Sequence, residues 1–311
     1  MAHYLKNIKV YIPATSANLG PGFDCVGIAL DLWNQFELEI DPMQKKLRVE
    51  NYGEGAHELP LDAKNLVVQT MLQTLPDRFA RRMHQWKIRC HNQVPCRSGL
   101  GSSSTAVLAG VSFSQAIQKG SVHLMDILKQ AASLEGHPDN VAPAVMGGLV
   151  VAAIKDGQVF VHPIPGVMTE VVVCVPDYHF LTNYARTLVP KKFTRTDTVF
   201  NISRSLLVVE SIRTGNDELL AQVMEDRLHE PYRLPHIPGA EEAVRAALAK
   251  GAVAVSLSGA GPGLLAFARK RHHAIGRAMQ SAFQRAGLKA RYWIIRACTS
   301  GLRLDGVPCR L

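Results

Sequence analysis

The sequence has few cysteines, and none of them lie at the close spacing that metal sites and redox motifs use. Its six cysteines are spread from residue 25 to residue 309 and form no C-x-x-C pair. We therefore expect reduced thiols in a cytoplasmic protein, without a disulfide framework. No apolar run reaches the roughly 18 residues that a membrane-spanning helix needs, and the first residues lack the apolar stretch of a signal peptide. We expect neither export nor membrane anchoring.

Aromatic residues are also scarce, at 6%, although the formal net charge is +9. Proteins that bind single-stranded nucleic acid interleave aromatic side chains with basic ones, whereas the basic residues here lie in short scattered groups such as 269–271. We expect no nucleic-acid partner and interpret the excess charge as a solvated surface. Hydrophobic residues make up 47% of the 311 residues, which suffices for one large or two moderate domains.

A Walker A loop and the third glycine of a Rossmann fingerprint are missing, but residues 97 to 105 form another glycine-rich loop. It lies between an alternating segment and an Ala-rich segment that is typical of a helix. Glycines let backbone amides approach a ligand closely, a helix start attracts anions, and hydroxyls suit phosphate oxygens or a cation. The alternative is a helix cap without a ligand. The predicted phosphate loop comprises Arg97, Ser98, Gly99, Leu100, Gly101, Ser102, Ser103, Ser104 and Thr105.

The rest of the pattern predicts two units. In the first, the pattern indicates strands at 8–12, 30–40, 47–51, 86–94 and 149–154, helices at 65–74 and 123–135, and a loop from 13 to 22. We expect 47–51 to be the hairpin partner of the strand before it. The turn-rich stretch 156–165 is the candidate boundary, which gives domains of residues 1–160 and 161–311.

The second unit combines strands and helices in an order that indicates an α+β fold, with helices on an antiparallel-rich sheet. Its predicted elements are a strand at 171–175, helices at 196–214, 217–224 and 240–249, a strand pair within 252–268, a helix at 272–286 and a strand at 290–297.

Three glycine-rich segments in this order, residues 13–24, the phosphate loop and residues 256–263, resemble those of the GHMP kinase superfamily. The first of them, with the segments 135–140 and 230–239, is similar to the branch that acts on L-homoserine. The resemblance spans nearly the whole chain. It implies a first domain similar to domain 2 of ribosomal protein S5 and a ferredoxin-like second domain. It also implies ATP- and Mg²⁺-dependent phosphorylation of the L-homoserine hydroxyl, in threonine biosynthesis.

The same resemblance assigns roles to individual residues. Ser103 and Glu135 match the magnesium ligands of the family, a hydroxyl and a carboxylate that suit a hard cation. The residues that match substrate contacts are Asn18, Asp24, His137, Asn140, Thr182, Arg186 and Arg233. The two arginines match those for the substrate carboxylate, because a planar guanidinium can bond two oxygens at once.

Each of these assignments has a structural alternative. Asn18 and Asp24 could cap a tight turn, Glu135 could be a surface acid at a helix end, and His137 could be a polar turn residue. By the resemblance Gly259 and Gly261 help to seat the nucleotide. Asn65 lies near the adenine or only caps a helix.

The resemblance does not identify which residue, if any, acts as the general base. Some relatives use an aspartate as base, whereas the homoserine branch has an asparagine, which Asn140 matches. An amide cannot accept a proton productively near neutral pH, so we hypothesise that Asn140 orients the hydroxyl while the proton passes to the phosphate. Asp139 is the rival base. These two residues and Ser103 are the predicted catalytic group.

Two other functions stay open from the sequence alone. One is a GHMP kinase that acts on a mevalonate-like or sugar alcohol, which would not need both Arg186 and Arg233. The other is a basic RNA-binding protein, since a fold shared with a ribosomal protein does not determine function. The sequence does not fix the oligomeric state, and a homodimer is one state open to the chain.

Overall fold

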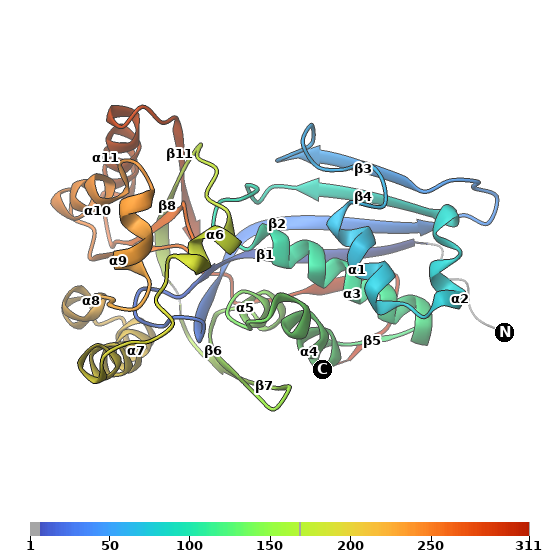
Figure 1. Cartoon of the computed structure of the whole chain (residues 1–311), viewed down its shortest axis with the longest axis horizontal. Helices are drawn as coiled ribbons and strands as arrows, with labels where there is room; N and C mark the ends of the chain where they lie inside the picture. The colour runs from blue at the N-terminus through green and yellow to red at the C-terminus, as the bar shows by residue number, and fades with distance from the viewer. Residues whose placement is uncertain (1–6, 168, 311) are drawn as a thin grey trace.

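The computed structural model describes residues 7–167 and 169–310. Two units lie at opposite ends of an elongated molecule, with the first loop (residues 18–25) and the glycine-rich segments near the junction (Figure 1). Among the described residues, no helix combines the length and the apolar character that crossing a membrane would require.

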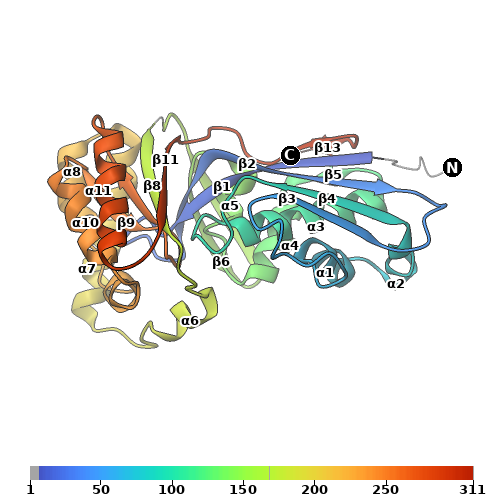
Figure 2. The same cartoon turned by 90° about the horizontal axis from the view of Figure 1, so that it is seen from above.

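The first unit is built on a sheet that contains seven strands within the described ranges. Their order is β12 (Arg303–Asp305), β1 (Asn7–Ala17), β2 (Val26–Ile40), β4 (Trp86–Asn92) and β3 (Arg48–Gly53), while β6 (Leu149–Lys155) pairs with β2 and β7 (Gln158–Ile164) pairs with β6. One face carries α1 (Leu66–Thr74), α3 (Ser102–Lys119), α4 (Leu124–Glu135) and α5 (Val141–Met146). Figure 2 shows α1, α3 and α4 below the sheet. Side chains such as Ile12, Phe36 and Phe113 fill the core between sheet and helices.

Two expectations about this unit were wrong. β3 does not form a hairpin with β2, because it pairs in parallel with β4, which lies between them. The expected loop from residue 13 begins later, since β1 continues to Ala17 and stays paired with β2, with a register shift between Pro13 and Ala14. The turn-rich stretch at 156–165 contains β7, joined to β6 by Asp156 and Gly157, both with positive φ (51° and 74°).

The second unit has a four-stranded antiparallel sheet in the order β11 (Ala290–Arg296), β8 (Glu170–Pro176), β10 (Leu264–Phe267) and β9 (Ala254–Leu257). α10 (Ala240–Ala249) and α11 (His272–Arg285) cover one face, as Ala243 and Phe283 show. On the other face, α7 (Arg195–Thr214) and α8 (Asp217–Val223) pack together with strands of the first unit. The α+β prediction is confirmed.

Several short elements were not predicted. They include α2 (Asp77–Ala80), β5 (Val122–His123), α6 (Thr182–Thr187), α9 (Glu230–Arg233) and β13 (Cys309–Arg310), besides α5, β7 and β12. β13 pairs with β5 and β12 pairs with β1, so the C-terminal segment returns to the first unit. The division at residue 160 stays a prediction, and the pairing of β7 with β6 places residues 158–164 in the first sheet.

Candidate active site

The phosphate loop connects β4 to the start of α3, as the sequence predicts. Gly99 and Gly101 have positive φ, 78° and 70°, and α3 begins without a side-chain cap. A Cβ on Gly99 would lie 2.1 Å from the carbonyl oxygen of Ser258, and one on Gly101 would lie 2.2 Å from Oγ1 of Thr15. Only glycine fits between these neighbours. The amides at the start of α3 therefore stay available to an anionic ligand.

A cavity between the two units contains most of the predicted site. The phosphate loop lines it with Arg97, Ser98, Gly99, Gly101, Ser102, Ser103 and Ser104, the glycine turn (residues 258–263, between β9 and β10) with Gly259, Ala260 and Gly261, and the first loop with Asn18 and Asp24. The remaining lining residues are Glu135, His137, Asp139, Asn140, Phe180, Leu181, Thr182, Arg186 and Arg233. Leu100 and Thr105 do not line it: Leu100 is in the core, and Thr105 Oγ1 donates to the Ser102 carbonyl, 2.8 Å away.

A second cavity opens on the other side of the loop. It shares Arg97, Ser102 and Ser103 with the first one and is mainly apolar, with Phe36, Leu59 and Val67 in its lining. Asn65 lies here, but its Oδ1 accepts from the Val67 amide (3.1 Å) and its Nδ2 donates to the Pro60 carbonyl (3.0 Å). It caps α1, in agreement with the structural alternative, and also borders a space suited to an apolar ring.

Two arginines of the second unit face the first cavity. Arg233 is 2% exposed, and Arg186 lies at the end of α6. Burial, and then the charge of Arg186, lower the pKa of Arg233. Two like charges that share a cavity favour an anion between them.

Asn140 and Asp139 are both engaged by neighbours. Oδ1 of Asn140 accepts from Oγ1 of Thr15 at 2.8 Å. Oδ1 of Asp139 lies 2.5 Å from Nδ1 of His137 and 3.0 Å from the Asn140 amide nitrogen. The hydrogen bond to Asp139 raises the pKa of His137, although burial opposes this effect. His137 and Asp139 therefore act as a pair at the cavity wall.

Asn18 fixes the first loop to the glycine turn. Its Nδ2 donates to the Gly259 carbonyl (2.8 Å), and its Oδ1 accepts from the Asp24 amide (2.9 Å). These bonds match the turn-capping alternative. They also bring both residues to the cavity.

Comparisons with known proteins agree with this geometry. Residues 65–148 match the family "GHMP kinases N terminal domain" and residues 208–285 match "GHMP kinases C terminal". The homoserine kinase of Moorella thermoacetica is 38% identical over 295 residues, which cover 94% of this chain and 98% of that protein. The homoserine kinase of Aquifex aeolicus is 34% identical over 299 residues, 96% of this chain and 99% of that protein.

This chain belongs to the homoserine kinase family of GHMP kinases. The crystal structure of homoserine kinase from Cytophaga hutchinsonii matches it with a TM-score of 0.81 and 27% identity, over 98% of this chain and 99% of that one. The mevalonate kinase of L. major, at 18% identity and a TM-score of 0.72, shares the fold. The two-domain GHMP architecture expected from the sequence is thereby confirmed, and the family uses ATP as its co-substrate.

The two predicted magnesium ligands of this family member lie in the same cavity. Ser103 and Glu135 offer oxygen donors, which a hard cation prefers. Burial raises the pKa of Glu135, although His137 and a hydrogen bond with Ser104 oppose the rise. Glu135 forms none of the ion pairs found among the described residues. A bound cation would offset the lost solvation of this carboxylate, so the residues fit the group.

The geometry also brings together three potential ligands that the sequence did not predict as a metal site. One ligand atom each of Asp24, His137 and Asp139 lies within 4.8 Å of the others. Asp24 and Asp139 are already bonded, to Arg186 and His137 respectively. This group therefore has less capacity for a cation than Ser103 and Glu135.

The sequence analysis did not predict some of the residues at or beside the cavity. Phe180 and Leu181 line the cavity immediately before Thr182, and Thr15 contacts Asn140 from β1. An apolar pair before a short helix carries no specific signal. The position of Thr15 within the matched block 13–24 was the available indication.

Proposed function

We propose that this chain transfers the γ-phosphoryl group of ATP to the side-chain hydroxyl of L-homoserine, giving O-phospho-L-homoserine for threonine synthesis. The observation that carries the proposal is the pair of arginines, Arg186 and Arg233, beside Asp24 in a cavity lined by the phosphate loop. An amino acid has a carboxylate for the arginines and an ammonium for the acid. A neutral sugar alcohol would leave these charges unused, and mevalonate has no ammonium group for Asp24.

The positions of the phosphate loop and the two cavities support a binding mode in which the nucleotide extends across the start of α3, from one cavity to the other. The triphosphate would lie on the amides of Gly99 to Ser104, with the base in the apolar cavity beside Asn65. Gly259 and Gly261 border the loop from the opposite side. Phosphoryl transfer needs positioning and charge stabilisation more than covalent chemistry, which this arrangement supplies.

Asn140 supports the hypothesis of an oriented hydroxyl. Since its Oδ1 accepts from Thr15, its Nδ2 is the part of the amide that can point into the cavity. An N–H donor would bond the oxygen of the substrate hydroxyl and turn its proton away. The phosphate is then the acceptor of that proton, and Asp139 holds His137 instead of acting as base.

Magnesium is proposed to lie between Ser103 and Glu135. When bound, it would neutralise charge on the β- and γ-phosphate oxygens. Thr182 and His137 complete the proposed substrate contacts, since both line the cavity.

The proposed enzyme has no nucleic-acid partner. Many of its exposed arginines pair with acids of the same surface, which supports the view that the excess charge is dispersed. Such pairs are Arg213 with Glu210, Arg269 with Asp217, Arg285 with Glu242 and Arg291 with Glu54. RNA binding that weakens steeply with added salt would contradict this view.

We also propose a homodimer through α7. This helix exposes Val199, Ile202 and Leu206 (57, 57 and 69%) at a spacing that places them on one face. In an antiparallel pair of these helices, Val199 would oppose Leu206 and Arg195 would oppose Glu210 of the second copy. Light scattering should show a dimer that Leu206→Glu converts to a monomer, and a monomeric parent protein would contradict it.

A coupled assay of ADP release tests the main proposal. We expect ATP- and Mg²⁺-dependent turnover with L-homoserine to exceed that with L-serine, L-threonine or mevalonate. Mevalonate as the preferred substrate would favour the alternative GHMP kinase.

A further inference from the structure

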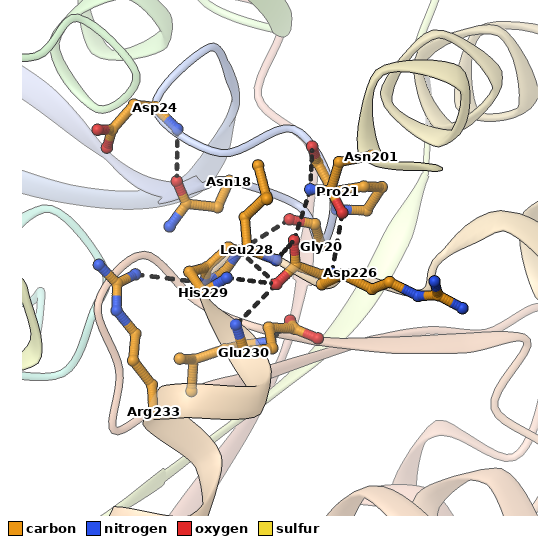
Figure 3. Close-up of polar contacts among 12 residues, drawn as sticks. Asn18, Gly20, Pro21, Asp24, Asn201, Asp226, Leu228, His229, Glu230 and Arg233 are labelled. Carbon is orange, nitrogen blue, oxygen red and sulfur yellow. Dashed lines mark hydrogen bonds and ion pairs between the residues drawn. The ribbon is translucent and has the colours of Figure 1, made fainter. Parts of the chain in front are cut away.

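His229 is a fully buried histidine at the junction of the two units, outside the lining of the substrate cavity. It directly precedes α9, and its ring stacks on Phe23 of the first loop, with centroids 5.0 Å apart and an interplanar angle of 18°. Figure 3 shows it between Gly20 of the first loop and Arg233 of α9.

The partners of the ring determine its tautomer. Nε2 lies 2.8 Å from the carbonyl oxygen of Gly20, which can only accept a hydrogen bond, so Nε2 carries the proton. Nδ1 lies 3.3 Å from Nη1 of Arg233, which can only donate, so Nδ1 is the acceptor. Burial, together with the charge of Arg233, lowers the pKa of His229, although Asp226 opposes this. The ring is therefore neutral and uses both nitrogens.

The backbone that carries His229 is held by Asp226. Oδ2 of this aspartate accepts from the amides of His229 (2.8 Å) and Glu230 (2.7 Å). Its Oδ1 accepts from Nδ2 of Asn201 at 2.7 Å, and the same Nδ2 lies 3.3 Å from the Pro21 carbonyl oxygen. Asn201 and His229 thus both fasten the first loop to the second unit (Figure 3).

Arg233 makes its hydrogen bonds with neutral acceptors. Nε donates to the Ala185 carbonyl (3.2 Å), and Nη1 reaches His229 and the Gly259 carbonyl (3.4 Å). Its guanidinium carbon lies 5.4 Å from the centroid of the Phe23 ring. None of the ion pairs found in the described ranges involves Arg233. Its side chain is oriented without being neutralised, as an anion site requires.

We propose that His229 is a positioning residue for the amino-acid substrate, acting through Arg233 and the first loop. By accepting from Arg233 and donating to Gly20, it fixes the carboxylate-binding guanidinium and the loop that carries Asp24 in one arrangement. This inference rests on the proposed homoserine site. A histidine with only a packing role would contribute to the stability of the whole protein and would not act selectively on one substrate.

Two substitutions separate the two hydrogen bonds of the ring. His229→Gln can place an amide donor near the Nε2 position but has no acceptor at the position of Nδ1. His229→Asn can place an acceptor near Nδ1 but does not reach Gly20. We expect His229→Gln to raise the homoserine KM roughly tenfold, the usual effect of one lost hydrogen bond to a charged group. The KM for ATP should stay unchanged, and kcat should change much less than the homoserine KM.

His229→Asn should restore part of the homoserine KM relative to His229→Gln, because it keeps the acceptor for Arg233. In the double variant with Arg233→Lys, the two effects on KM should be smaller than additive, since both act through one guanidinium. His272→Gln is the matched control, because Nε2 of His272 also bonds a backbone carbonyl, that of Ala268 (3.1 Å), away from the cavity lining. It should leave both KM values unchanged.

Three results would overturn the inference while the parent protein still phosphorylates homoserine: an unchanged homoserine KM in folded His229→Gln, equal increases in both KM values, or strict additivity with Arg233→Lys. Loss of homoserine turnover in the parent itself would instead contradict the proposed function. Nitrogen-15 spectra of labelled histidines in the parent protein give a test that requires no folded variant. One ring should keep the Nε2–H tautomer at low pH, and the absence of such a ring would also overturn the inference.

Discussion

Arg186 and Asp24 form an ion pair that joins the two units across the substrate cavity. Nη2 of Arg186 lies 3.0 Å from Oδ1 of Asp24, and Nη1 lies 3.3 Å from Oδ2. The sequence resemblance assigns Arg186 to the substrate carboxylate, and Asn18 and Asp24 to the amino end and the hydroxyl of the substrate. We therefore expect the substrate to exchange this contact for two others, with its carboxylate on Arg186 and its ammonium on Asp24.

Arg186→Lys tests this exchange. Lysine keeps the charge but cannot bond two carboxylate oxygens in one plane, so the homoserine KM should rise roughly tenfold with a smaller change in kcat. Arg285→Lys is the control, because Arg285 pairs with Glu242 on an exposed surface (2.7 Å). Steady-state kinetics of both variants give the homoserine KM and kcat values to be compared. A normal homoserine KM in Arg186→Lys would remove Arg186 from the site.

Arg233→Lys should also act mainly on the homoserine KM. The guanidinium is buried, lines the cavity and donates hydrogen bonds to neutral acceptors such as the Ala185 carbonyl. Lysine has no planar set of donors that could make the same hydrogen bonds. We expect the homoserine KM to rise tenfold or more, because the substrate carboxylate would lose its hydrogen bonds to a buried guanidinium. Unchanged homoserine kinetics would show that the carboxylate binds elsewhere.

Asp139→Asn distinguishes the two hypotheses for the substrate proton. If Asn140 orients the hydroxyl and the phosphate accepts the proton, this variant should retain most of its kcat, because asparagine can still bond His137 and the Asn140 amide. Single-turnover rates provide the measurement. A folded variant without kcat but with nearly normal KM would identify Asp139 as the base.

Glu135→Gln should weaken the response to magnesium. The carboxylate is desolvated and the neutral amide is a poorer ligand for a hard cation, so the Mg²⁺ concentration at half-maximal rate should increase roughly tenfold. Titration of activity with MgCl₂ at saturating ATP measures this shift. Glu241→Gln, on the exposed side of α10, should have the titration curve of the parent. Identical curves for all three proteins would exclude Glu135 as a ligand.

Glu230 makes stability dependent on pH. Burial raises the pKa of this carboxyl to about 8, although the hydrogen bond from the Leu257 amide opposes the rise. Because the folded state holds the proton more tightly than the unfolded state, the contribution of Glu230 to stability is full below its ordinary pKa of 4.5 and is lost as the pH rises through about 8.

Glu230→Gln should therefore lose this dependence. Relative to the parent, its Tm should increase as the pH rises from 4.5 to about 8. Thermal unfolding followed by circular dichroism across this interval gives the result. A constant difference in Tm would mean that Glu230 does not titrate there.

Much of the fold could be predicted because it depends on local patterns. α1 begins after Asn65, and α10, α11 and β11 lie within a residue of their predicted positions, since side-chain periodicity and caps determine them. The partner of β3 could not be predicted, because β4 inserts beside it from more than 30 residues further along the chain.

The site shows the same division. The resemblance predicted Asn18, Arg186 and Arg233 as substrate contacts, and all three line one cavity. Their roles there stay predictions. The ion pair between Asp24 and Arg186 and the ring of His229 between Gly20 and Arg233 join segments that are 162 and 209 residues apart at their widest. Such contacts depend on how the two units pack, which no short motif specifies.

Identification of the product tests the central claim most directly. The protein is incubated with ATP, MgCl₂ and L-homoserine, and the mixture is followed by phosphorus-31 NMR and mass spectrometry. We expect a phosphomonoester signal that grows as the γ-phosphate of ATP disappears, with the mass of O-phospho-L-homoserine and in equal amount to ADP. Folded protein that consumes no ATP with homoserine, or that releases only inorganic phosphate, would contradict the account.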